Sequence, residues 1–257
     1  MTGKVHLRVA GSTAFVTFDR PAVRNAMTFS MYDELEAACV AIRSDPAIKV
    51  AVFRGSGGEA FVAGTDIQQF LGFETAADGV RYEERIDAVI GAVEALPIPT
   101  IAVIEGFAMG GGFALTIACD LRIATPDAKF GYPIARTLGN CLSMANMARL
   151  LAYFGPALAK RILLLADSMD AQAACDAHFV LEIVERENID VRVAELCERL
   201  ANHAPITMRA AKEAIRRNMV QGIAQARDLI EEVYGSADFR LGVESFLAKK
   251  RPAWTGE

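Results

Sequence analysis

A glycine-rich segment, GFAMGGGFAL at residues 106–115, is the first feature of the sequence that could do chemistry. It follows an apolar stretch of strand character and precedes a short stretch of helical character. Backbone N–H groups at a helix start lack intrahelical acceptors and favour negative charge, and glycine lets a ligand approach them. The segment matches neither G-x-G-x-x-G nor G-x-x-x-x-G-K-[ST], which disfavours a nucleotide loop. An oxyanion hole and close packing of helix against strand both remain open.

A second segment, FVAGTDIQQF at residues 61–70, leads through small apolar residues to Thr65 and Asp66. The N–H of Thr65 would supply a second hydrogen-bond donor. Asp66 is expected to cap a short helix that follows it, because aspartate is a preferred N-cap residue. Taken alone, the segment is more typical of an ordinary strand-to-helix turn than of a site.

The elements that must position these segments alternate between strands and helices. Residues 4–9 and 14–18 predict a hairpin, and residues up to about Arg43 predict a helix with one buried face, capped by Thr28 or Ser30. Further strands are expected at 48–54, 100–105, 119–124 and 179–184, and further helices at 80–96, 140–154 and 157–166. From about residue 189 only helical periodicity is seen. This alternation predicts an α/β core with largely parallel strands.

The composition excludes several other classes of protein. The chain has 257 residues, 53% of them hydrophobic, a net charge of −5 and five cysteines. The apolar fraction excludes a disordered chain, and the lack of a basic patch argues against nucleic-acid binding. The N-terminus lacks the apolar core of a signal peptide, and no apolar run is long enough to span a membrane. Scattered cysteines in odd number indicate reduced thiols, so the expected location is the cytoplasm.

The histidines offer neither a catalytic triad nor a metal site. His6 falls on the first predicted strand, whereas His178 and His203 fall in helical segments. No cluster of histidines, cysteines and carboxylates has the spacing of metal ligands, so no metal is expected.

Several segments together resemble one family, and they occur in family order over nearly the whole chain. They are RNAMTFSMYDEL (24–35), FVAGTDI (61–67), PIPTIAVIEGFAMGGG (97–112), ACDLRIAT followed by AKFGYP (118–133), and FLAKKRPAWTG (246–256). In this set the sequence resembles the enoyl-CoA hydratase/isomerase, or crotonase, superfamily. The resemblance implies an α/β fold, a spiral of ββα units at residues 1–188. It also implies a helical C-terminal assembly region at 189–257 that builds trimers, often paired into hexamers.

The resemblance also implies a substrate and a site. The family holds an acyl-CoA thioester so that its carbonyl oxygen accepts two backbone N–H bonds, which by motif position are those of Thr65 and Gly111. Coenzyme A is then part of the substrate, and no separate cofactor is expected. The remaining positions that match the substrate-binding segments are Arg24 and Ala26 along the pantetheine and phosphates, Ala63, Gly64, Asp66 and Ile67 under the adenine, and Gly110, Pro133, Ile134 and Arg136.

Coenzyme A is polyanionic while the chain is acidic overall, so local cations must pair with it. Arg24 and the cluster Lys249-Lys250-Arg251 are the candidates. The cluster is also typical of a solvated helix end that complements the helix dipole.

The sequence departs from the family at the two glutamates that a hydratase uses as base and acid. By motif position these fall on Ala114 and Ile134, which are both apolar. Standard hydration is therefore not expected, whereas double-bond isomerisation through a single base or decarboxylation fits. A non-catalytic acyl-CoA-binding or assembly protein is the alternative. Candidates to replace the glutamates are Arg136, Asn140, Cys141 and Ser143, and the acidic residues Glu83, Glu84 and Asp87 of an expected lid at 79–90. Thr65 and Tyr132 offer hydroxyls near the expected site, but the pKa of neither hydroxyl suits base work at neutral pH.

Overall fold

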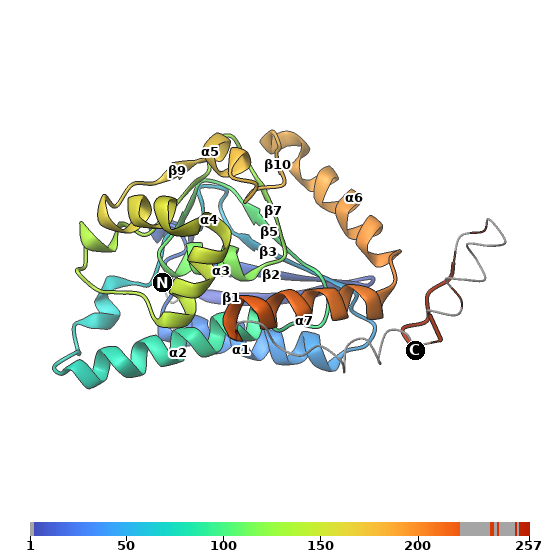
Figure 1. Ribbon diagram of the computed structural model, residues 1–257, viewed down its shortest axis with the longest axis horizontal. Helices are drawn as coiled ribbons and strands as arrows, with labels where there is room; N and C mark the ends of the chain where they lie inside the picture. Colours follow the sequence, from blue (N-terminus) through green and yellow to red (C-terminus); the bar gives the residue numbers. More distant parts are fainter. Residues whose placement is uncertain (1–2, 222–236, 239–240, 242–249, 251) are drawn as a thin grey trace.

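The computed structural model describes residues 3–221, 237–238, 241, 250 and 252–257 of the chain. Its larger sheet contains six strands (Figure 1). Across the sheet they are β1 (Lys4–Ala10), β2 (Thr13–Asp19), β3 (Val50–Gly55), β5 (Thr100–Ile104), β7 (Leu121–Ala124) and β10 (Glu182–Ile183). β1 and β2 form the predicted antiparallel hairpin, and the other neighbours pair in parallel, as expected for an α/β core.

The fold contains a second sheet of four short strands. Across it lie β4 (Ala60–Val62), β6 (Phe107–Met109), β8 (Lys129–Gly131) and β9 (Met169–Asp170). β4, β6 and β8 are parallel to one another, and β9 is antiparallel to β8. Two or three residues are too few for the alternation of a strand to be visible in a sequence, which is why sequence analysis did not predict this sheet.

The chain winds between the two sheets in repeated ββα units. The helices that close the units are α2 (Ala76–Glu94), α3 (Gly111–Ala118) and α4 (Met144–Leu164), which follow β3-β4, β5-β6 and β7-β8 respectively. Each unit leaves one strand in each sheet, which confirms the predicted spiral. The carboxyl ends of β4, β6 and β8 therefore lie side by side, and the loops that follow them meet at one edge of the second sheet.

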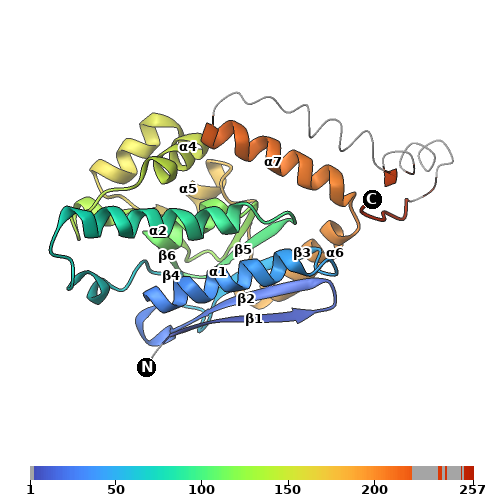
Figure 2. The ribbon, with the colours of Figure 1, turned by 90° about the horizontal axis from the view of Figure 1, so that it is seen from below.

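Helices cover both faces of the larger sheet. The helix α1 (Phe29–Ser44) has one buried face, as predicted, and its N-cap is Thr28, whose Oγ1 accepts from the N–H of Met31 at 3.3 Å. α1 and α2 lie side by side on the face opposite to α6 (Ile189–Ala201) (Figure 2). On the outer face, α6 buries Val193 and Leu196 against strand residues such as Val52.

The remaining helices follow the predicted pattern with local differences. α4 contains a kink at Gly155, where φ is 62°, which matches the two helices predicted around it. α2 begins at Ala76 rather than residue 80, because Thr75 and Asp78 form a capping box that adds a turn. α5 (Ala171–Asp176) was not predicted, and α7 (Pro205–Gln221) continues the helical C-terminal region. The division at residue 188 stays a prediction.

Two segments differ from their prediction for identifiable reasons. The strand expected at 179–184 is confined to β10, because the N–H groups of Phe179 and Val180 bond to the carbonyl of Ala174 and both side chains are buried. His178 and His203 lie in turns after α5 and α6 rather than within helices. In the described ranges no helix combines the length and apolarity needed to cross a membrane.

Candidate functional site

The topology brings the two motif segments together. Residues 63–66 follow β4, and residues 110–111 follow β6, its parallel neighbour. A Cβ placed on Gly110 would lie 3.7 Å from the Cα of Gly64, and one on Gly64 would lie 3.5 Å from the carbonyl oxygen of Met109. Both glycines have positive φ, +108° for Gly64 and +52° for Gly110, which other residues rarely adopt. The two segments that sequence analysis paired are therefore in contact.

Two backbone donors are free at this junction. Gly111 is the first residue of α3, so its N–H has no acceptor within the helix. The residues on either side of Thr65 are hydrogen-bonded to Met27. The N–H of Asp66 donates to the carbonyl of Met27 at 2.8 Å, and the N–H of Met27 donates to the carbonyl of Gly64 at 2.8 Å. Within the described part of the chain, the N–H groups of Thr65 and Gly111 have no acceptor of their own. A pair of fixed, unoccupied donors suits an oxygen that becomes negatively charged.

The glycine run separates into residues with different tasks. A Cβ on Gly112 would lie 2.0 Å from the carbonyl oxygen of Val62, so this buried glycine is needed for packing α3 against β4. A Cβ on Gly111 would lie 2.6 Å from the hydroxyl of Tyr32 and 3.6 Å from Oγ1 of Thr65. Close packing of helix against strand thus explains Gly112, whereas the partly exposed Gly111 remains the candidate donor.

A chain of three hydroxyls holds Thr65. Its Oγ1 lies 2.8 Å from the hydroxyl of Tyr32 on α1 and 2.8 Å from the hydroxyl of Tyr82 on α2. Burial raises the pKa of Tyr82 to about 12 and raises that of the fully buried Tyr32 as well. All three groups therefore stay protonated at neutral pH and fix the orientation of the Thr65 backbone. Sequence analysis missed both tyrosines; the one signal was an aromatic residue in the otherwise charged stretch RYEER.

The predicted CoA-binding residues lie on two adjacent segments. Residues 24–27 run beside 63–66, with the N–H of Ala63 donating to the carbonyl of Arg24 at 3.0 Å. Arg24 and Asn25 both have left-handed backbones, with φ of 54° and 57°. The exposed guanidinium of Arg24 lies 4.6 Å from the ring centroid of Phe107 and forms no ion pair among the described residues. Its charge is therefore available to an anion. The segments bring together Arg24, Ala26, Ala63, Gly64, Asp66 and Ile67.

Arg20, which sequence analysis did not single out, ties these segments together. Its Nη1 donates to Oδ2 of Asp66 at 2.7 Å and to the carbonyl of Ala26 at 3.1 Å. The other oxygen of Asp66 accepts from the N–H of Gln68 at 3.0 Å, which confirms the predicted cap of a 3₁₀ helix, Ile67–Phe70. Burial opposes ionisation of Asp66, but the bonds from Arg20 and Gln68 outweigh it and lower the pKa of Asp66.

We expect the substitution Asp66→Asn to reduce the free energy of unfolding by about 1–2 kcal/mol at pH 7, because it removes the charge but keeps the cap. The folded pKa lies below 3.8, so the ionised form stabilises the fold above that pH, and the benefit is lost as the pH falls through the lowered value. Urea unfolding of both proteins between pH 2 and 7 measures the difference, which should close at the acid end. A pH-independent difference would show that the charge plays no part. Asp66→Ala, which also loses the cap, should cost about 1 kcal/mol more.

The positions of the two hydratase glutamates lie in apolar surroundings. Ala114 is buried in α3, and Ile134 is half-buried in a 3₁₀ helix, Pro133–Ala135, that follows β8. Beside them, Tyr132 is 1% exposed and its ring centroid lies 5.0 Å from that of Phe113. Its buried hydroxyl has no hydrogen-bond partner among the described residues. The two positions therefore carry no carboxylate, and a tyrosine hydroxyl lies in the same apolar surroundings.

The structure sorts the other candidates for proton transfer. Arg136, Asn140 and Cys141 are exposed on the segment between the 3₁₀ helix and α4. Ser143 is the N-cap of α4, accepting from the N–H of Asn146 at 3.1 Å and donating to Asp87 at 2.6 Å.

Among the cations predicted to bind coenzyme A, Lys250 is exposed, whereas Lys249 and Arg251 lie outside the described residues.

The three acidic residues of α2 differ in their surroundings. Glu84 is exposed, and Asp87 is held by Ser143 and lies 4.0 Å from Arg149. Glu83 is half-buried, and its Oε2 accepts the N–H of Ser143 at 3.2 Å. Burial raises its pKa above the ordinary value of 4.5, an effect that the Ser143 bond opposes and the charge of Asp87 increases.

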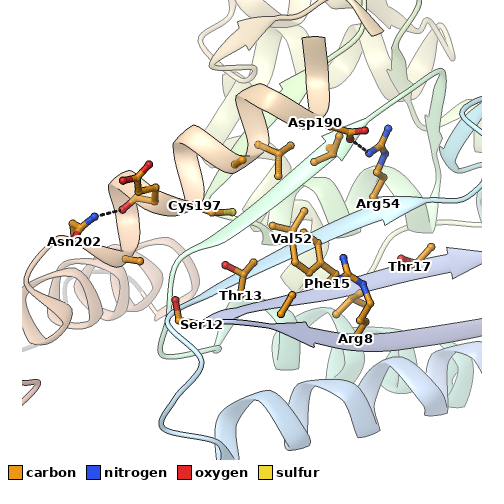
Figure 3. Close-up of a pocket in the computed structure, with 17 residues that line it drawn as sticks. Arg8, Ser12, Thr13, Phe15, Thr17, Val52, Arg54, Asp190, Cys197 and Asn202 are labelled. Atoms are coloured by element: carbon orange, nitrogen blue, oxygen red, sulfur yellow. Dashed lines mark hydrogen bonds and ion pairs between the residues drawn. The ribbon is translucent and has the colours of Figure 1, made fainter. Parts of the chain in front are cut away.

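A cavity of about 750 Å³ lies elsewhere, between the outer face of the larger sheet and α6 (Figure 3). Phe15, Val52 and Cys197 line it, and an ion pair between Arg54 and Asp190 lies at one end. None of the predicted site residues lines this cavity. It is therefore separate from the junction of Thr65 and Gly111.

The spiral of ββα units, with its helical C-terminal region, defines the class of the protein as a crotonase-type α/β fold. The family model described as enoyl-CoA hydratase/isomerase matches residues 8–257, and the chain belongs to this family.

Known relatives are similar over almost their full length. A crotonyl-CoA hydratase of Syntrophomonas wolfei subsp. wolfei is 31% identical over 242 residues, covering 93% of this chain and 92% of the relative. A 2,3-dehydroadipyl-CoA hydratase of Escherichia coli is 29% identical over 245 residues, covering 94% of each. The crystal structure of an enoyl-CoA hydratase/carnithine racemase from Magnetospirillum magneticum matches with a TM-score of 0.91 and 32% identity, covering 100% of this chain and 97% of the other.

Proposed function

We propose that the protein is an acyl-CoA enzyme that binds the thioester carbonyl oxygen between the N–H groups of Thr65 and Gly111. The observation that carries the proposal is this pair of free donors on neighbouring strand ends. When a proton or a carboxyl group leaves the α-carbon, the electron pair moves to the thioester oxygen. Two preorganised donors stabilise the resulting enolate because they meet charge that develops only during the reaction.

Coenzyme A would lie along the segments 24–27 and 63–67. Arg24 is exposed and has no ion-pair partner among the residues that the structure describes, so it is suited to a phosphate or pyrophosphate group. Ala26, Ala63 and Gly64 are small, which leaves room for the pantetheine and adenine against the backbone. Pro133, Ile134 and Arg136, beyond β8, would border the acyl group.

The reaction we propose is isomerisation or decarboxylation rather than hydration. Hydration requires one group to remove a proton from water and another to protonate the α-carbon. Alanine at 114 and isoleucine at 134 can do neither, although the named relatives described above are hydratases. Stabilising the enolate is the step that isomerisation and decarboxylation share, and it requires only the two N–H donors and a single proton carrier.

We further propose a cytoplasmic homotrimer, or a hexamer made of two trimers, assembled through residues 189–257. The enzyme would need no cofactor beyond the coenzyme A of its substrate. Analytical ultracentrifugation of the full chain tests the assembly, and a monomer at micromolar concentration would contradict it.

Incubation with a panel of acyl-CoA thioesters, followed by mass spectrometry, tests the function. We expect conversion of at least one β,γ-enoyl-CoA or carboxyacyl-CoA. We expect hydration of crotonyl-CoA to be at least about 100-fold slower than in a hydratase that has both glutamates. Rapid hydration of crotonyl-CoA would contradict the assignment. Thermal stabilisation by CoA esters without any turnover would instead support the alternative, a non-catalytic acyl-CoA-binding protein.

A further inference from the structure

Glu83 is the acidic residue of α2 that lies toward the candidate site. It is adjacent in sequence to Tyr82, whose hydroxyl contacts Oγ1 of Thr65 at 2.8 Å. On its other side, the Ser143 N–H at the start of α4 donates to its Oε2 at 3.2 Å. Glu83 therefore follows the tyrosine that holds Thr65, and it contacts the segment that comes after Ile134, the second glutamate position.

The charge of Glu83 acts on three tyrosine hydroxyls around the site. Burial is the main cause of the raised pKa of Tyr32, Tyr82 and Tyr132, and the negative charge of Glu83 raises each of them further. These hydroxyls come from α1, from α2 and from the end of β8. One carboxylate thus lies within electrostatic reach of both the hydroxyl chain at Thr65 and the hydroxyl of Tyr132, which has no hydrogen-bond partner in the described part of the chain.

We propose that Glu83 is the catalytic proton carrier of the site, in place of the two glutamates that a hydratase would have at positions 114 and 134. The inference rests on the proposed function. The Glu83 carboxylate would take a proton from the α-carbon, whose C–H electron pair moves to the thioester oxygen at the N–H groups of Thr65 and Gly111. Return of the same proton to the γ-carbon gives the isomerised double bond; in a decarboxylation, the protonated Glu83 would deliver its proton to the α-carbon after carbon dioxide leaves.

The surroundings of Glu83 fit this task. One oxygen is held by the Ser143 N–H, while Oε1 has no partner among the described residues and is available to a substrate. Partial burial shifts the pKa of Glu83 upward from 4.5, toward the operating pH, where a proton carrier works best. The groups that interact with it are Asp87 on its own helix, Tyr82 beside it, Tyr32 on α1, Tyr132 after β8, and the Ser143 N–H at the start of α4. Arg149 on α4 is bonded to Glu94 and lies 4.0 Å from Asp87.

Exchange of the α-proton in D₂O tests the inference, with saturated acyl-CoA thioesters of two to eight carbons as probes and mass gain as the readout. The test variant is Glu83→Gln, whose amide oxygen still accepts the Ser143 N–H. The matched control is Glu84→Gln on the neighbouring exposed residue, and Glu83→Asp serves as the conservative variant. We expect Glu83→Gln to slow exchange by about 10²- to 10⁴-fold, Glu84→Gln to be unchanged, and Glu83→Asp to fall between them.

The pH dependence supplies a readout that a structural role would not change. Exchange by the wild-type protein should rise with pH along a limb set by a pKa above 4.5, and this limb should be absent from Glu83→Gln. Wild-type exchange that Glu83→Gln retains would overturn the role of Glu83 and leave the proposed function intact. A wild-type protein that is thermally stabilised by thioesters but exchanges no α-proton would overturn this inference, and failure to bind any thioester would overturn the proposed function with it.

Discussion

In a Tyr32→Phe background, proline at position 111 is expected to slow acyl-CoA turnover about 100- to 1,000-fold relative to alanine at the same position. Both substitutions add a Cβ, but only proline removes the backbone N–H that we propose as an oxyanion donor. The expected factor is the typical effect of losing one donor from an oxyanion hole. The comparison therefore isolates a main-chain group that ordinary mutagenesis leaves in place.

The background substitution is required by the geometry of Gly111. A Cβ there would lie 2.6 Å from the hydroxyl oxygen of Tyr32, which Tyr32→Phe removes, while the next atoms stand at ordinary contact distances of 3.6 and 3.8 Å. Proline is well tolerated at the first position of a helix, and Gly110 before it has no Cβ to clash with the ring.

Single-turnover rates on a thioester that the protein converts, with thermal unfolding as a check of folding, make the measurement. Equal rates for the proline and alanine variants, both folded, would show that the Gly111 N–H is not a donor to the reacting oxygen. A lower rate in both variants relative to Tyr32→Phe alone would report the added Cβ and not the N–H.

The second large effect is expected on stability, from Gly112→Ala. Its Cβ would lie 2.0 Å from the carbonyl oxygen of Val62 and 2.8 Å from two further Val62 atoms. This neighbour is backbone in a paired strand and cannot rotate away, so α3 must move off β4. We expect a loss of about 3 kcal/mol or more in the free energy of unfolding, the upper end for overpacking a core. Because Gly111 is the preceding residue, acyl-CoA turnover should fall as well.

Chemical denaturation measures this loss, and Gly79→Ala is the matched control. Gly79 lies within α2 and a Cβ there would meet nothing within 4 Å. The control should gain about 0.5–1 kcal/mol, because alanine loses less entropy than glycine in a helix. A Gly112→Ala protein as stable as wild type would mean that α3 and β4 can separate without cost.

The sequence by itself determined the features that depend on local chemistry. Hydrophobic alternation predicted the hairpin of β1 and β2, and residue type predicted the caps at Thr28 and Asp66. The resemblance of the ordered motifs to the enoyl-CoA hydratase/isomerase family predicted the α/β spiral, and with it the contact between the segments around Thr65 and Gly111. The apolar residues at 114 and 134 are likewise visible in the sequence alone, because a missing carboxylate needs no fold to be recognised.

Only the tertiary structure decided which side chains support these segments. Tyr32 meets Thr65 across 33 positions of sequence, Arg20 meets Asp66 across 46, and Glu83 meets the Ser143 N–H across 60. Such pairs depend on how two parallel strand ends and two helices pack, and no periodicity within either segment contains that information. The same holds for the glycine run. The carbonyl of Val62, 50 residues earlier in the chain, requires glycine at 112, whereas the N–H of Gly111 has no acceptor in the described part of the chain.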